Sequence, residues 1–191
     1  NPPSASLPEG GPNVITDGLE LHVVSDGQVY VDAGGAFGLI PRALFSRYMQ
    51  PDVQNRVPMT LNSLIVRSRG KTILVDTGLG DRLTDVEKAR WGVERPEGGL
   101  VEALGKLSIR PEDVDIVVNT HLHADHCGGN TRHDGSELKA TFPAATYLVQ
   151  RIEWAEAVNP DARTRGTYFG ENYVPLLECG QLELLHGDCL L

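Results

Sequence analysis

Alternating apolar and polar positions predict β-strands near the start of the chain. Two short runs of this kind, Leu19–Val24 and Gln28–Asp32, flank Ser25-Asp26-Gly27. Because Asp-Gly is a frequent turn pair between alternating strands, we predict a β-hairpin here. Before it, residues 1–13 (NPPSASLPEGGPN) are rich in Pro, Gly and Ser. This composition predicts a flexible lead-in, followed by a single domain over residues 14–191.

A long connection from residue 33 to residue 57 follows, and it is unusually apolar for a loop. Long loops in compact domains are often functional. We therefore interpret its large apolar side chains as a candidate substrate pocket, with packing beneath a lid as the alternative. These side chains are Phe37, Leu39, Phe45, Tyr48 and Met49.

A second hairpin pattern joins Leu61–Arg67 to Lys71–Asp76 through Ser68-Arg69-Gly70. Its second strand leads directly into Thr77-Gly78-Leu79-Gly80. Glycine permits backbone conformations that other residues avoid, so we expect a sharp turn immediately after this strand.

The remainder of the chain alternates predicted strands and helices. Leu100, Leu104 and Leu107 recur at the spacing of one helix face, which predicts a helix over residues 98–107. Strands first, and then strands alternating with helices, favour an α/β fold in which helices flank a sheet. The later elements are a strand, a strand with a short helix, a polar loop and a last strand: Asp115–Asn119, Thr146–Gln150, Arg151–Val158, Asn159–Pro175 and Gln181–Leu185.

Charge and cysteine content narrow the function. The 191 residues carry a net charge of −9, so a polyanion would be repelled, which argues against nucleic acid or an anionic membrane as a partner. Three widely spaced cysteines argue against a disulfide framework, and no stretch approaches the length of a membrane span. We expect a cytoplasmic protein, and the start at Asn1 indicates residues trimmed or left out upstream.

The densest chemistry lies at residues 119–129, NTHLHADHCGG. His121 and His123 are two residues apart, so in an extended segment both imidazoles point to the same side. Asp125 and His126 follow where the strand turns, and they can direct an oxygen and a third imidazole toward a second ion. Imidazole plus carboxylate is the ligand set of Zn²⁺ or a similar metal in a catalytic site. A bare His-x-His occurs in many unrelated contexts, but the complete pattern followed by Gly-Gly predicts metal binding.

This motif resembles the signature of the metallo-β-lactamase superfamily. The resemblance implies that His121 and His123 bind one metal, and that Asp125 and His126 bind the second. ILVDTGLG (73–80) is similar to the family's strand-Asp-x-Gly element, which implies that Asp76 orients a ligand histidine by hydrogen bonding. The alternative for Asp76 alone is a turn cap. The implied fold is the N-terminal portion of an αββα sandwich.

A longer likeness, from about Leu19 to Leu185, resembles the branch of N-acyl-homoserine lactone lactonases and methyl parathion hydrolase. It implies two divalent ions, Zn²⁺ first and Mn, Co or Fe as alternatives, which lower the pKa of a shared water to about 7. The bridging hydroxide would open the lactone ring, with Asp125 carrying a proton to the leaving oxygen. The expected partner is a small lactone or ester, and a homodimer is an open alternative for the assembly.

The family's site needs a third histidine, a bridging aspartate and a last histidine, which the resemblance places beyond Leu191. We therefore expect an incomplete C-terminus and a fragment with little activity alone. The alternatives are an organophosphate or aryl ester substrate, a glyoxalase-type thioester, or a non-catalytic fragment that binds metal. His186 in HGD is a poor substitute for the missing ligand and is expected at a strand end, while His22 and His133 are interpreted as ordinary surface or loop residues.

Overall fold

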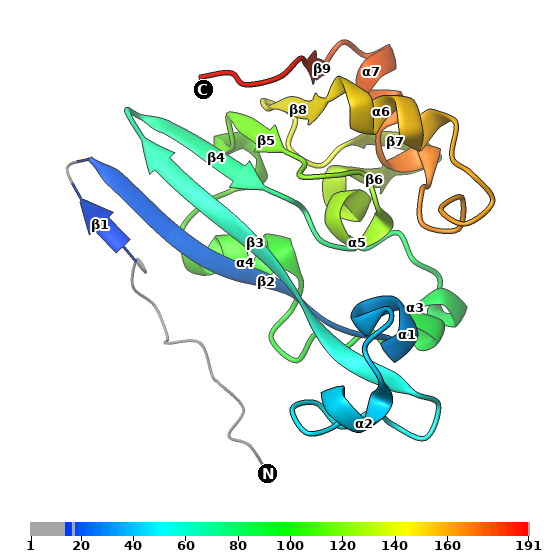
Figure 1. Cartoon of the computed structure of the whole chain (residues 1–191). Coiled ribbons are helices and arrows are strands. Elements are labelled where there is room, and N and C mark those ends of the chain that lie inside the picture. The colour runs from blue at the N-terminus through cyan, green and yellow to red at the C-terminus, as the bar shows by residue number, and fades with distance from the viewer. Residues whose placement is uncertain (1–13, 17, 191) are drawn as a thin grey trace.

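The computed structural model describes residues 14–16 and 18–190, so the predicted lead-in at 1–13 lies outside the described residues. Its main feature is a seven-stranded mixed sheet in the order β1-β2-β3-β4-β5-β8-β9 (Figure 1). Neighbours from β1 to β4 pair antiparallel, whereas β4, β5, β8 and β9 are parallel. The strands are β1 (Val14–Thr16), β2 (Leu19–Asp32), β3 (Arg56–Ser68), β4 (Lys71–Val75), β5 (Ile116–Val118), β8 (Thr146–Gln150) and β9 (Leu182–Leu185).

The first predicted hairpin is wrong, because residues 19–32 form one continuous strand. Both halves of β2 pair with β3, and the register shifts between Ser25 and Gln28. Asp26 turns inward at this β-bulge and is 1% exposed, so the Asp-Gly pair serves a bulge and makes no turn. The cause is tertiary: Asp26 forms an ion pair with Arg95, far along the chain.

Most of the later elements are confirmed within one or two residues. The β3–β4 hairpin turns through Arg69 and Gly70, both with positive φ. The predicted helices are α4 (Leu100–Lys106) and α6 (Arg151–Val158). The turn toward a helix after the strand at 115–119 is confirmed by α5 (Ala124–Cys127). The sequence interpretation missed α3 (Asp85–Trp91), α7 (Val174–Glu178) and the hairpin of β6 (Thr131–Asp134) with β7 (Glu137–Ala140).

The two faces of the sheet differ. Helices α4, α6 and α7 cover one face, where strand residues such as Ile65, Leu74 and Val117 are fully buried in the main core. The opposite face is also apolar, but in the described part of the chain it remains partly exposed. The apolar side chains on this face are neighbours across β2, β3, β4 and β5: Leu21, Val23, Leu64, Val66, Ile73, Val75, Ile116 and Val118.

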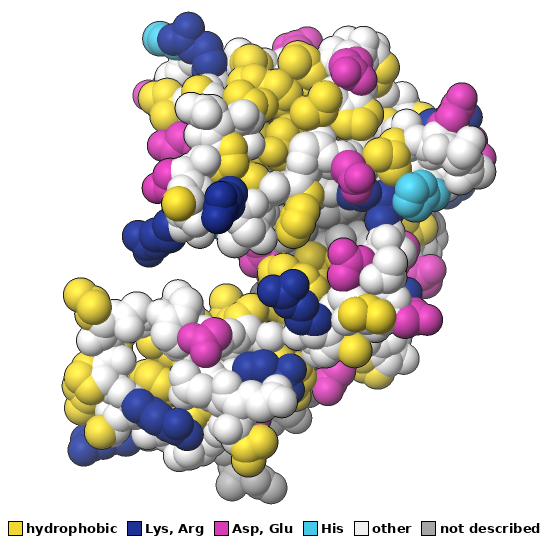
Figure 2. Space-filling model, turned by 90° about the vertical axis from the view of Figure 1, so that its right-hand side faces the viewer, with side chains coloured by type: hydrophobic (Ala, Val, Ile, Leu, Met, Phe, Trp, Pro, Cys, Tyr) yellow, Lys and Arg dark blue, Asp and Glu magenta, His cyan; other side chains and the backbone are white. Residues whose placement is uncertain are grey.

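The long 33–57 connection folds into a small lobe at the far ends of β2 and β3. It contains α1 (Ala33–Phe37) and α2 (Arg42–Phe45), where the sequence indicated only a loop. Figure 2 shows a deep hollow between this lobe and the body of the molecule. Among the described helices, none has the length and apolar content needed to cross a membrane.

Candidate metal centre

The candidate ligands lie at the carboxyl ends of two neighbouring parallel strands. Asp76 directly follows β4, and residues 119–126 follow β5. The carboxyl ends of parallel strands are the usual place for ligand sites in open α/β sheets. Asp76 adopts φ 60°, an uncommon conformation for a residue other than glycine, and its amide donates to the Val118 carbonyl at 2.9 Å. The backbone itself therefore aims this carboxylate across to the histidine segment.

Asp76 and Thr120 determine which nitrogen atom of two histidines is free. Asp76 Oδ2 accepts from His126 Nδ1 at 2.9 Å and from Thr120 Oγ1 at 2.7 Å. Because the single hydroxyl proton of Thr120 is used there, His121 Nδ1 is the donor in its 3.1 Å hydrogen bond to Thr120 Oγ1. Both rings are thus held as tautomers with a free Nε2. Sequence reasoning identified Asp76 but missed Thr120.

The three imidazoles face one another. The ring centroid of His121 lies 4.6 Å from that of His123 and 3.9 Å from that of His126. His126 Nε2 lies 3.5 Å from Asp125 Oδ2. Two ligand atoms on one tetrahedral Zn²⁺ at about 2.0–2.2 Å are separated by about 3.4 Å, so this pair fits a shared ion without rearrangement. The chemistry of this donor set and the spacing of the Asp125–His126 pair therefore fit a divalent metal.

The number of donors is limited. Within the described residues, no group of three or more His, Cys, Asp and Glu side chains meets in a geometry that could hold a metal. The assignment of His121 and His123 to one ion, and of Asp125 and His126 to a second, stays a prediction. A complete coordination shell would need donors beyond these four side chains.

The surroundings shift the pKa values of His121 and His126 in opposite directions. Burial, followed by the positive charges of His126 and His123, holds the pKa of His121 below its ordinary value. Burial also opposes protonation of His126, but the hydrogen bond to Asp76 and the charge of Asp125 outweigh it and raise its pKa. Cys127 is buried, which strongly raises the pKa of its thiol. The Cys127 thiol donates to the Leu122 carbonyl oxygen at 3.2 Å.

His123 is supported by a second part of the chain that sequence reasoning missed. Its ring contacts the Tyr168 ring edge-on at 4.8 Å between centroids. The Tyr168 hydroxyl donates to Glu153 Oε1 at 3.0 Å, and the same oxygen accepts from the Leu122 amide at 2.8 Å. Burial and this hydrogen bond raise the pKa of Tyr168 to about 12. Glu153 therefore ties α6 and the 159–173 loop to the His121–His123 segment.

The five predicted pocket residues divide into two groups. Phe37, Phe45 and Met49 pack with one another beside Ala33 and Val57, and the two phenylalanine rings stack at 4.4 Å. Leu39 and Tyr48 are 102% and 87% exposed. Of the five, Leu39 and Tyr48 are fully accessible to a molecule outside the lobe, Phe37 and Met49 are partly exposed, and Phe45 is buried.

The remaining histidines lie apart from the four candidate ligands. His22 was interpreted as a surface or loop residue, and this is wrong: it is 6% exposed on β2, because it faces the helix-covered side and hydrogen bonds to Glu20 at 2.5 Å. His133 is exposed on β6, and His186 is exposed directly after β9.

Comparisons with known proteins bear on this arrangement. Residues 57–159 match the model of the metallo-beta-lactamase superfamily. An N-acyl homoserine lactonase, AttM, from Azorhizobium caulinodans is 34% identical over 118 residues, which are 58% of this chain and 41% of that protein. The chain thus spans less than half the length of this curated relative.

Solved structures agree on the fold. A "probable metal-dependent hydrolase" from Staphylococcus aureus has a TM-score of 0.80 and 25% identity, covering 91% of this chain and 61% of the other. The dizinc quorum-quenching lactonase AidC, solved with a product, has a TM-score of 0.68 and 21% identity, covering 95% and 63%. The predicted fold and resemblance are confirmed, and the chain belongs to the metallo-β-lactamase superfamily.

Proposed function

We propose that this chain is part of a metal-dependent hydrolase that opens the ring of N-acyl homoserine lactones. The observation that carries the proposal is the Asp76–Thr120 arrangement, which leaves His121 Nε2 and His126 Nε2 free beside His123 and Asp125. The lactonase relative and the dizinc lactonase of the same fold support this choice of substrate class.

Each side chain has a defined part in this proposal. His121 and His123 would hold one divalent ion, most simply Zn²⁺, and Asp125 and His126 a second. When bound, the ions would supply Lewis acidity and an activated water at neutral pH. Asp76 holds His126 in its ligating tautomer. Asp125, whose carboxylate lies 3.5 Å from His126 Nε2, would pass a proton to the leaving ring oxygen.

The acyl chain of the substrate would lie along the 33–57 lobe. Leu39 and Tyr48 are fully exposed there, and Ile40, Leu44 and Val53 add further exposed apolar side chains to the same lobe. The stacked rings of Phe37 and Phe45 lie within the lobe. The contacts continue toward the site, because Val31 packs both against this lobe and in the cluster that contains Ala124. Ala124 stands between His123 and Asp125.

Ring opening releases an acid, so turnover by the intact hydrolase of which this chain is part is measured by proton release with Zn²⁺, Mn²⁺ or Co²⁺ present. The panel contains short- and long-chain acyl-homoserine lactones, a phosphotriester and a glutathione thioester. We expect lactones to be preferred, and His126→Ala to abolish turnover while His133→Ala, an exposed histidine on β6, does not. Preference for the phosphotriester or the thioester would reassign the substrate class.

A second candidate is a chain that binds metal without turnover, and the absence of a three-donor group among the described residues favours it. Metal analysis after dialysis separates the two. Bound Zn²⁺ without hydrolysis of any substrate in the panel would support the second candidate, and turnover would exclude it.

A further inference from the structure

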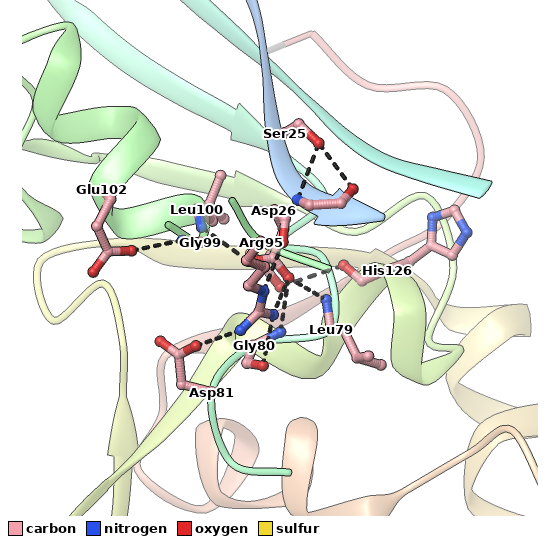
Figure 3. Close-up of polar contacts among 12 residues, drawn as sticks. Ser25, Asp26, Leu79, Gly80, Asp81, Arg95, Gly99, Leu100, Glu102 and His126 are labelled. Carbon is pink, nitrogen blue, oxygen red and sulfur yellow. Dashed lines mark hydrogen bonds and ion pairs between the residues drawn. The ribbon is translucent and has the colours of Figure 1, made fainter. Parts of the chain in front are cut away.

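The bulge in β2 places a carboxylate inside the molecule, next to the metal segment. Ser25 Oγ accepts from the Gly27 amide at 3.0 Å and closes the bulge. Asp26 consequently points inward instead of to solvent. Figure 3 shows its side chain at the centre of polar contacts that come from three separate stretches of chain.

Every oxygen of this carboxylate is engaged. Asp26 Oδ2 accepts from the Leu79 amide at 2.8 Å and from the Gly80 amide at 3.1 Å. Asp26 Oδ1 accepts from the Leu100 amide, at the start of α4, at 2.9 Å. Arg95 donates to Asp26 Oδ2 at 2.6 Å. One buried side chain thus holds both the loop after β4 and the start of α4.

Arg95 also hydrogen bonds to the loop after β4. Its guanidinium donates to the Gly80 carbonyl at 2.8 Å and, through Nε, to the Asp26 carbonyl at 2.7 Å. It also pairs with Asp81 at 2.5 Å. Gly80 is therefore fixed through its amide by Asp26 and through its carbonyl by Arg95.

The loop that Asp26 and Arg95 hold, residues 77–80, contacts the Asp125–His126 turn directly. The Thr77 amide donates to the His126 carbonyl at 2.7 Å, and the Gly129 amide donates to the Gly78 carbonyl at 3.3 Å. A Cβ added to Gly78 would lie 2.4 Å from Asp26 Cβ, and one added to Gly128 would lie 2.2 Å from the Leu79 carbonyl oxygen. The Asp26 side chain thus packs directly on the loop, and the backbone of the loop packs directly on the turn, with no space for a side chain between them.

We propose that Asp26 and Arg95 are a positioning pair that sets the placement of the Asp125–His126 turn through the 77–80 loop. The inference rests on the proposed metal function for its consequence, but the coupling itself is a property of the chain. Neither residue touches a candidate ligand side chain in the contacts described above. Their effect reaches His126 through the backbone of Thr77 and Gly78.

The test compares Asp26→Asn with Asp115→Asn in the full chain. Asp115 is a suitable control, because it also binds a backbone amide, that of Thr72, and a cation, Lys71, at the opposite end of β4. The metal-free readout is the NMR signals of the His126 ring and the Cys127 amide. The metal readout is the Zn²⁺ dissociation constant, from competition with a chromophoric chelator.

We expect Asp26→Asn to move the His126 and Cys127 signals and to weaken Zn²⁺ binding by about 10-fold, the lower end of the range seen when direct partners of metal ligands are removed, because Asp26 acts one step further from the ligands. Asp115→Asn should change neither. Unchanged signals and affinity in Asp26→Asn would overturn the inference. If the wild-type chain binds no Zn²⁺, the proposed function fails, and the NMR comparison still decides this inference.

If Asp26→Asn does not fold, Arg95→Lys provides the same test. Lysine keeps the charge beside Asp26 but loses the planar fork that reaches Asp26 and Gly80 together. A smaller displacement of the same His126 and Cys127 signals would support the proposal, and unchanged signals would overturn it.

Discussion

Replacing Arg95 by methionine is expected to leave the buried Asp26 carboxylate without its cation and so to lower the stability of the protein. The side chain of Asp26 is 2% exposed and that of Arg95 is 14% exposed, so the ion pair is buried. Removing one partner of a buried pair costs about 3–5 kcal/mol of the free energy of unfolding. Asp26 keeps its hydrogen bonds from the Leu79, Gly80 and Leu100 amides, so we expect the lower end, about 3 kcal/mol.

The loss should depend on pH with a definite sign. Burial raises the pKa of Asp26, against Arg95 and the amide donors, and without Arg95 this pKa rises further. A carboxyl group whose pKa is higher in the folded than in the unfolded state binds more protons when the protein is folded. Its contribution to the free energy of unfolding is therefore fully present below the unfolded-state pKa and is lost as the pH rises through the folded-state pKa. The deficit of Arg95→Met is therefore smaller at about pH 4 than at about pH 8.

Urea unfolding followed by far-UV circular dichroism at both pH values measures this deficit. The double variant Asp26→Asn/Arg95→Met removes both charges and should recover part of the stability lost in Arg95→Met. A deficit below about 1 kcal/mol that is equal at both pH values would refute the reasoning, because it would mean that Asp26 is solvated without Arg95.

Three further predictions follow from single contacts. Asp76→Asn removes the charge that holds His126 Nδ1, so a chelator competition should show about 10–100-fold weaker Zn²⁺ binding, and equal affinity would contradict it. Gly128→Ala should lower stability in thermal unfolding by about 1–3 kcal/mol through its clash, whereas Gly105→Ala, with open space around it on α4, should not lower it. The hydrogen bonds from Arg110 lower the pKa of Asp113 to about 2. The ion pair therefore stabilises the folded state above about pH 3.9, the ordinary pKa of aspartate, and this stabilisation is lost as the pH falls toward about 2. NMR measures the pKa of Asp113 directly, and a value of about 3.9 would contradict the prediction.

The sequence predicts best what depends on neighbouring residues. Strand alternation and the Ser68-Arg69-Gly70 turn were sufficient to predict the β3–β4 hairpin. The spacing of four residues was sufficient to predict that their side chains lie close together: His121, His123, Asp125 and His126. Asp26 was misinterpreted because its inward direction depends on Arg95, 69 residues away, which a local pattern does not contain.

Other omissions had a usable signal. Helix α3 begins with a capping box in which Thr84 and Glu87 hydrogen bond to each other's backbone, a pattern visible in the sequence. Thr120, in contrast, has no distinguishing pattern. Its position between Asp76 and His121 is set by the pairing of β4 with β5, and only the fold shows it.

The close contact between the 77–80 loop and the histidine turn has a consequence for how the site forms. Thr77 and His126 are 49 residues apart, so the chain must close a long loop before either segment gains its neighbour. Such non-local contacts slow folding, because the entropy of closing the loop is lost before the contact contributes. The turn that carries His126 is therefore in its native place only after this long-range contact has formed, so a metal ion bound there would stabilise the folded state over the unfolded one.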